Sequence, residues 1–83
     1  MSVLFVCNAG GEVGGGHVMR SLTLARALEA RGVSVSFLCP PAVTAVLEAF
    51  APDIHRVWAA STEPARIVAA VRAARADLVV FDH

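Results

Sequence analysis

The sequence predicts a single α/β domain, residues 1–83, built around a four-stranded parallel sheet. Four short apolar runs alternate with three segments in which apolar residues recur at helical spacing. The runs are almost continuously apolar, which is typical of strands that are buried on both faces of a sheet. Strands separated by helices need crossover connections, and crossovers join parallel strands. The expected order is therefore β-α-β-α-β-α-β.

The first strand and the first helix are expected on either side of a glycine-rich loop. Residues 3–7 form the strand, and residues 8–16 hold five of the six glycines, which predicts a turn. No Gly or Pro interrupts residues 17–31, so a helix is expected there, with Gly32 as its stop. Its apolar face comprises Val18, Leu22, Ala25 and Leu28.

The alternation continues through the middle of the chain. Residues 33–38 are rich in β-branched and aromatic side chains and predict the second strand. Pro40 and Pro41 are interpreted as a breaker, after which residues 42–50 are expected to form the second helix. A third short strand is expected over residues 54–58.

The last helix and strand complete the pattern. Residues 61–64, STEP, are a helix-start signal, because polar capping residues precede a Pro in the first turn. Residues 78–81 predict the fourth strand, and the sequence stops just after it. We therefore expect a truncated Rossmann-like three-layer lobe, with its ligand at the carboxyl ends of the strands. The apolar face of the third helix comprises Ile67, Val68, Val71 and Ala74.

Composition and charge exclude several classes of protein. Apolar residues make up 57% of the chain and charged residues 17%, which is too hydrophobic for a disordered protein. The net charge is zero, so neither nucleic acid nor an anionic membrane surface is an expected partner. No apolar run is long enough to span a membrane and no signal peptide is recognisable, so a cytoplasmic location is expected. Cys7 and Cys39 are then expected to be free buried thiols.

The glycine-rich loop is the most informative segment for function. Glycines after a first strand let the backbone approach a ligand, and the next helix offers unpaired N–H groups, so the two together predict a cradle for an anion or a sugar. Two phosphate-binding patterns fail here. Met19 stands where a dinucleotide fingerprint needs Gly, and His17-Val18 replace the Lys and Ser/Thr of a P-loop. A merely flexible surface turn is the alternative interpretation.

His17 is the candidate catalytic residue. It follows Gly14, Gly15 and Gly16 at the expected start of the helix, where the helix dipole disfavours the imidazolium and suits a neutral general base. An ordinary surface histidine is the alternative. Arg20, in the next turn, either reaches back toward an anion or is simply solvated.

Asp82 and His83 end the fourth strand and are the second group of candidates. If that strand lies beside the first strand, both residues approach His17 at one crevice. The alternative is that they are solvated residues of a cut chain terminus. His55 is expected to be a structural residue with its hydrogen bonds satisfied. No spacing of His or Cys indicates a metal site, and no cofactor is expected.

Two segments resemble a known family. Residues 13–25, VGGGHVMRSLTLA, resemble the signature Ile-Gly-x-Gly-His-x-x-Arg-x-Leu-x-Leu-Ala of the UDP-sugar hydrolases of pseudaminic-acid biosynthesis, which are related to spore-coat polysaccharide biosynthesis proteins. Residues 80–83, VFDH, are similar to that family's strand that ends in Asp-His-Tyr. The resemblance extends over the whole chain but is specific only in these two segments.

The resemblance implies the N-terminal lobe of a two-lobed fold of the glycosyltransferase GT-B type. The family hydrolyses UDP-2,4-diacetamido-2,4,6-trideoxy-β-L-altropyranose by attack of water at the anomeric carbon, without a metal. His17 would be the general base, the backbone of residues 14–16 would line the sugar and phosphate pocket with Arg20 nearby, and Asp82 and His83 would lie in the same cleft. The uridine site would belong to a C-terminal lobe.

Two alternatives to the hydrolase stay open. Residues 6–8 are Val-Cys-Asn where the family has Arg-x-Asp, and the Gly-His segment is also similar to the start of GT-B glycosyltransferases. The chain could therefore be the acceptor-binding lobe of an inverting transferase, or a non-catalytic Rossmann-like binding module. In each case the 83-residue chain alone is expected to be inactive. Its open sheet edge and zero net charge predict self-association.

Overall fold

Strands and helices alternate along the chain in the predicted order. The computed structural model describes residues 1–7, 14–59 and 63–82. Within these ranges the strands are β1 (Ser2–Cys7), β2 (Ser34–Cys39), β3 (His55–Trp58) and β4 (Leu78–Asp82). The helices are α1 (Gly14–Glu29), α2 (Pro41–Phe50) and α3 (Pro64–Ala74).

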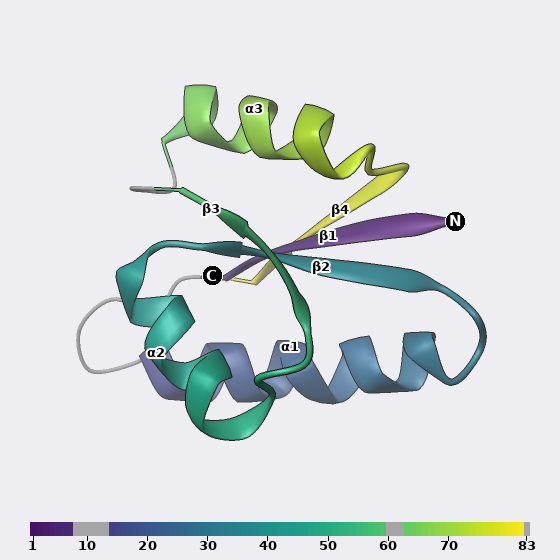
Figure 1. Cartoon of the computed structure of the whole chain (residues 1–83), viewed down its shortest axis with the longest axis vertical. Coiled ribbons are helices and arrows are strands. Elements are labelled where there is room, and N and C mark those ends of the chain that lie inside the picture. Colours follow the sequence, from purple (N-terminus) through teal and green to yellow (C-terminus); the bar gives the residue numbers. More distant parts are fainter. Residues whose placement is uncertain (8–13, 60–62, 83) are drawn as a thin grey trace.

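The strands form one sheet in the order β3-β2-β1-β4. All three strand pairs are parallel, which confirms the α/β prediction, and β4 lies beside β1. Helices α1 and α2 cover one face of the sheet and α3 covers the other, so the molecule has three layers (Figure 1). The chain is a small Rossmann-like three-layer unit.

Two apolar clusters fill the spaces between the layers. The larger cluster lies between the sheet and the helices α1 and α2. At its centre Phe5 and Phe37, which are cross-strand partners, stack with their ring centroids 5.0 Å apart. The smaller cluster lies between the sheet and α3 and includes Leu4, Val6, Leu38 and Ala70. Alternate residues of β1 and β2 therefore serve opposite faces, as the pleat of a doubly covered sheet requires.

The start of α1 differs from the prediction. The helix begins at Gly14 rather than at His17, so Gly14–Gly16 belong to its first turn and not to the preceding loop. Glycine is a poor helix former, so local propensity alone predicts that the helix starts only after the glycines, at His17. Val18 and Leu22 are buried against the sheet, and this packing sustains one more turn toward the amino terminus.

The other helix ends follow from local chemistry. Pro41, interpreted as part of a breaker, is instead in the first turn of α2, where its missing N–H costs no intrahelical bond. Helix α3 begins at Pro64, as the start signal predicts, with Glu63 as the N-cap. Gly32 has a φ of 83°, and the N–H of Val33 donates to the carbonyl oxygen of Leu28, which closes α1 as expected.

Both cysteines are free and buried at the carboxyl ends of β1 and β2, which confirms the expectation for them. Burial raises the pKa of the Cys39 thiol, so it is held protonated and unreactive at neutral pH. Among the helices of the described segments, none has the length and hydropathy that a membrane span needs.

Candidate functional site

The carboxyl edge of the sheet brings the ends of β1 and β4 together. Cys7, the last residue of β1, pairs in register with Asp82, the last residue of β4. Because β1 leads through residues 8–13 into α1, the helix starts at this same edge. The predicted adjacency of the glycine-rich region and the end of the fourth strand is therefore present in the backbone.

The predicted site residues are described to different extents. The helix backbone carries Gly14–Gly16, His17 and Arg20 in the first two turns of α1, and Arg20 is exposed. The side chains of His17 and Asp82 lie outside the described part of the structure, as do His83 and the loop residues 8–13. Their convergence in one crevice stays a prediction.

Gly16 occupies open space. A Cβ atom built on Gly16 meets no described heavy atom within 4 Å, and the residue is exposed. Packing among the described residues therefore does not require glycine here, although glycine weakens a helix.

The described residues contain no group of three or more His, Cys, Asp or Glu that could hold a metal ion. Cys39 and Cys7, nearest to the carboxyl edge, are each about 1% exposed and lie in the core. Any anion bound at this edge would meet backbone N–H groups and Arg20 rather than thiolates.

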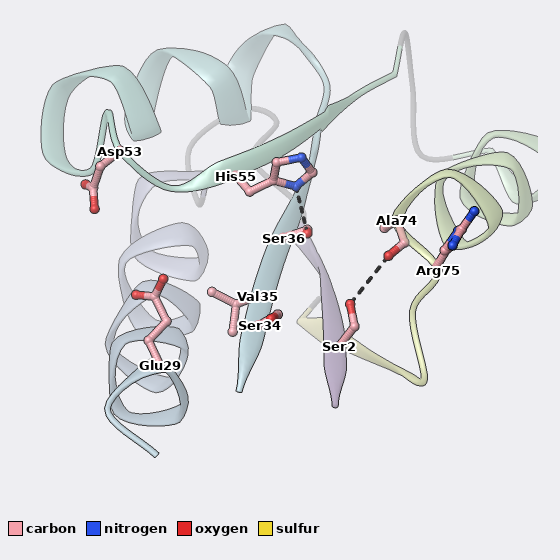
Figure 2. A pocket seen from close by; sticks show the side chains of 9 residues that line it. All are labelled: Ser2, Glu29, Ser34, Val35, Ser36, Asp53, His55, Ala74 and Arg75. Atoms are coloured by element: carbon pink, nitrogen blue, oxygen red, sulfur yellow. Dashed lines mark hydrogen bonds between the residues drawn. The ribbon is translucent and has the colours of Figure 1, made fainter. Parts of the chain in front are cut away.

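A hollow of about 540 Å³ lies at the opposite, amino edge of the sheet (Figure 2). Its floor is formed by hydroxyl side chains of β1 and β2, and His55 of β3 stands on one side. The end of α3 stands on the other side. The lining residues are Ser2, Glu29, Ser34, Val35, Ser36, Asp53, His55, Ala74 and Arg75.

Hydrogen bonds hold the polar groups of this hollow in place. The Oγ atom of Ser36 lies 2.9 Å from Nδ1 of His55. The hydroxyl of Ser2 donates to the carbonyl oxygen of Ala74 at 3.4 Å, and its backbone N–H donates to Oδ2 of Asp77 at 2.8 Å. These contacts tie β1 to the end of α3 and fix the orientation of the imidazole ring.

An ion-pair cluster borders the hollow on the α1 side. The guanidinium of Arg26 donates to both carboxylate oxygens of Asp53, at 2.8 and 3.0 Å, and to Oε1 of Glu29 at 2.9 Å. The hydrogen bonds from Arg26 lower the pKa of the Asp53 carboxyl, and the same contacts raise the pKa of Arg26. The Asp53 carboxylate is therefore ionised, and the same guanidinium also pairs with Glu29.

Sequence reasoning found only part of this hollow. His55 has the satisfied hydrogen bond expected of it, but the residue is exposed rather than enclosed. The serines at 34 and 36 were treated as part of a continuous apolar run. Their alternation with Val35 and Phe37 was the available signal, since alternation marks one polar face of a strand.

The fold and these two edges define a Rossmann-like α/β chain, and comparison adds nothing more specific. No family model matches the chain, and neither a curated protein nor a solved structure matches it. A statement about its activity must therefore come from its own residues and geometry.

Proposed function

We propose that the chain is the N-terminal lobe of a nucleotide-sugar-processing enzyme that hydrolyses UDP-2,4-diacetamido-2,4,6-trideoxy-β-L-altropyranose to the free sugar and UDP. The observation that carries the proposal is the meeting of three features at one edge: the end of β1, the end of β4 and the glycine start of α1. In open α/β sheets, ligands bind at the carboxyl ends of the strands. The resemblance of residues 13–25 and 80–83 to a hydrolase family supplies the substrate.

In the proposed reaction, His17 removes a proton from a water molecule. The water oxygen forms a bond to the anomeric carbon, and the bond between that carbon and the phosphate oxygen breaks, so that UDP leaves. The structure places the backbone of His17 in the first turns of α1, and the resemblance supplies its proposed role as the base. The N–H groups of Gly14–Gly16 would contact the sugar and phosphate, because N–H groups at a helix start lack intrahelical partners and bind anions. Arg20, Asp82 and His83 complete the proposed substrate contacts.

Under this proposal the uridine base binds to a second lobe. Among the described residues, the carboxyl edge offers backbone N–H groups at the start of α1 and the exposed Arg20, groups that suit a phosphate. The 83-residue chain alone is therefore expected to be inactive and to bind free UDP only weakly. Titration calorimetry with UDP measures this affinity. A micromolar dissociation constant for the chain alone would show that the proposal assigns the nucleotide site to the wrong lobe.

His17 is the test residue for the mechanism. In the two-lobed protein, His17→Asn is expected to lower kcat by about two to four orders of magnitude, because it removes the base. KM should change little, since the base acts mainly in the transition state. Steady-state kinetics with the UDP-sugar measure both, and thermal unfolding checks that the variant is folded. Near-normal kcat in a folded variant would remove His17 from the mechanism.

One observation favours a second candidate, the acceptor-binding lobe of an inverting glycosyltransferase. Val6, which stands where the resembled hydrolases carry Arg, is buried in β1, and Asn8 stands where they carry Asp, so the sequence has neither charge at these positions. Product analysis separates the two. Release of UDP and free sugar without any acceptor means hydrolysis, whereas UDP release that requires an acceptor means transfer.

A further inference from the structure

The face of the sheet toward α3 is divided into an apolar half and a polar half. Toward the carboxyl edge, Leu4, Val6 and Leu38 pack in the cluster beneath α3. Toward the amino edge, the same alternation places Ser2, Ser34, Ser36 and His55 on this face. Ser34 and Ser36 are two residues apart on β2, and the register places Ser34 beside Ser2 and Ser36 beside His55, so the four polar residues form one surface.

This polar half is not filled by α3. The helix ends at Ala74, and the hollow of about 540 Å³ opens between its end and β3 (Figure 2). That volume is within the range of about 300 to 1,000 Å³ that small-molecule sites occupy. Serine side chains in place of apolar ones give up packing against a helix, and a ligand that hydrogen-bonds to hydroxyl groups compensates for this loss.

The polar groups of the floor are held in one arrangement. Ser36 is only about 6% exposed, and its hydroxyl is held by Nδ1 of His55. The second ring nitrogen, Nε2, points away from Ser36 (Figure 2), and His55 is exposed. The buried contact therefore orients an imidazole whose outer nitrogen can donate to or accept from a ligand.

The charges around the hollow select against ions. Glu29 and Asp53 are paired with Arg26, and Arg75 is also a lining residue, so the charged groups around the hollow are of both signs. The carbonyl groups at the end of α3 carry the negative end of the helix dipole, which disfavours an anion. A bound cation would have to compete with Arg26, which is already paired with both carboxylates. A neutral ligand meets neither obstacle.

We propose that this hollow binds a neutral, polyhydroxylated small molecule, a polyol or an unphosphorylated sugar. Its hydroxyl groups would exchange hydrogen bonds with Ser34, Ser36 and Nε2 of His55. The site is at the amino edge of the sheet, opposite the carboxyl edge where the nucleotide sugar is proposed to bind. The two proposals are therefore independent, and each can fail alone.

The test is a titration of the 83-residue chain with sorbitol and, separately, with glucose, followed by NMR. Saturable shifts are expected in the His55 ring and in the backbone amides of the hollow, with dissociation constants in the millimolar range. Ser36→Ala removes the buried hydroxyl without adding bulk and should weaken binding about 3- to 10-fold, the effect of losing one hydrogen bond. Thr23→Val, which removes an exposed hydroxyl on α1, is the matched control and should change nothing.

Three results would overturn the proposal. The first is the absence of saturable shifts in the wild-type chain. The second is unchanged binding in His55→Ala, a variant at an exposed position that tests the site even if Ser36→Ala fails to fold. The third is tighter binding of inorganic phosphate than of either polyol at the same residues, because that would assign an anion to the hollow.

Discussion

Arg26 connects two parts of the chain that are distant in sequence. From α1 it reaches both Asp53, in the turn before β3, and Glu29, one turn along its own helix. Arg26 and Asp53 are exposed, so solvent and salt weaken the attraction between them. The bidentate geometry to Asp53 nevertheless fixes the position of the turn that leads to His55 and the hollow.

Asp53 is expected to make stability depend on pH in the acid range. Its pKa is lowered in the folded chain by the hydrogen bonds from Arg26, so its contribution is present above the unfolded pKa of about 3.9. That contribution is lost as the pH falls through the folded value. Urea unfolding should show wild type more stable than Asp53→Asn at neutral pH, with the difference shrinking below about pH 4. A difference that persisted unchanged into that range would contradict the assignment.

Arg75 has an unfavourable backbone conformation at the end of α3. Its φ of 52° and ψ of 44° lie in the left-handed region. This conformation costs free energy for residues other than Gly, Asn and Asp. Arg75→Gly is therefore expected to raise the free energy of unfolding by roughly 0.5 to 1 kcal/mol. Arg72→Gly, inside the same helix, is the control and should lower it by about the same amount. Destabilisation by Arg75→Gly would mean that the arginine side chain matters more than its backbone.

At the scale of elements, the first turn of α1 combines a weak helix former with a candidate binding role. Gly16→Ala should raise the free energy of unfolding of the chain by about 0.5 to 1 kcal/mol, because alanine favours the helix and the site is open. Under the proposed function, the same change in the two-lobed enzyme should reduce kcat/KM, since a Cβ would then stand between the backbone and the substrate. Leu24→Ala, on an exposed position of the same helix, is the control for activity.

A variant that gained stability and kept full kcat/KM would show that glycine at position 16 is not there for the substrate. The two measurements are made on different proteins, so a change in one does not impose a change in the other. Urea unfolding of the 83-residue chain reports the first, and steady-state kinetics of the enzyme report the second.

Some element boundaries follow from local sequence signals, whereas others depend on tertiary packing. The strand over residues 78–81 and the helix start at Pro64 were predicted closely, because an apolar run and a Pro in a first turn are local signals. The start of α1 was missed, because burial of Val18 and Leu22 overrides the weak helix propensity of glycine. The alternation of Ser34 and Ser36 with apolar residues indicates a polar strand face, but only the register shows that Ser2 and His55 extend this face across neighbouring strands.

At the scale of the whole molecule, β4 is an edge strand with solvent-exposed apolar side chains. Leu78 and Phe81 are 51% and 50% exposed, and no strand among the described residues pairs with the outer side of β4. Zero net charge provides little repulsion between copies. Edge strands of this kind pair with other chains unless charged residues protect them.

Self-association is therefore expected to rise with protein concentration. Phe81→Lys places a charge on the edge and should shift sedimentation profiles toward the monomer. Phe50→Lys makes the same change of charge at an exposed position on α2 and should leave association as it is in wild type. A wild-type chain that sediments as a monomer at high concentration would refute the prediction, as would equal effects of the two variants.

The sequence by itself determined the class of fold, because apolar runs separated by helical periods can be buried only as parallel strands between helices. It also determined that both cysteines are buried thiols. Only the tertiary structure decided that β4 lies beside β1, which brings Asp82 to the edge where α1 begins. It alone assembled the hydroxyl-lined hollow, because that surface is made from strands distant in sequence whose polar residues become neighbours through register.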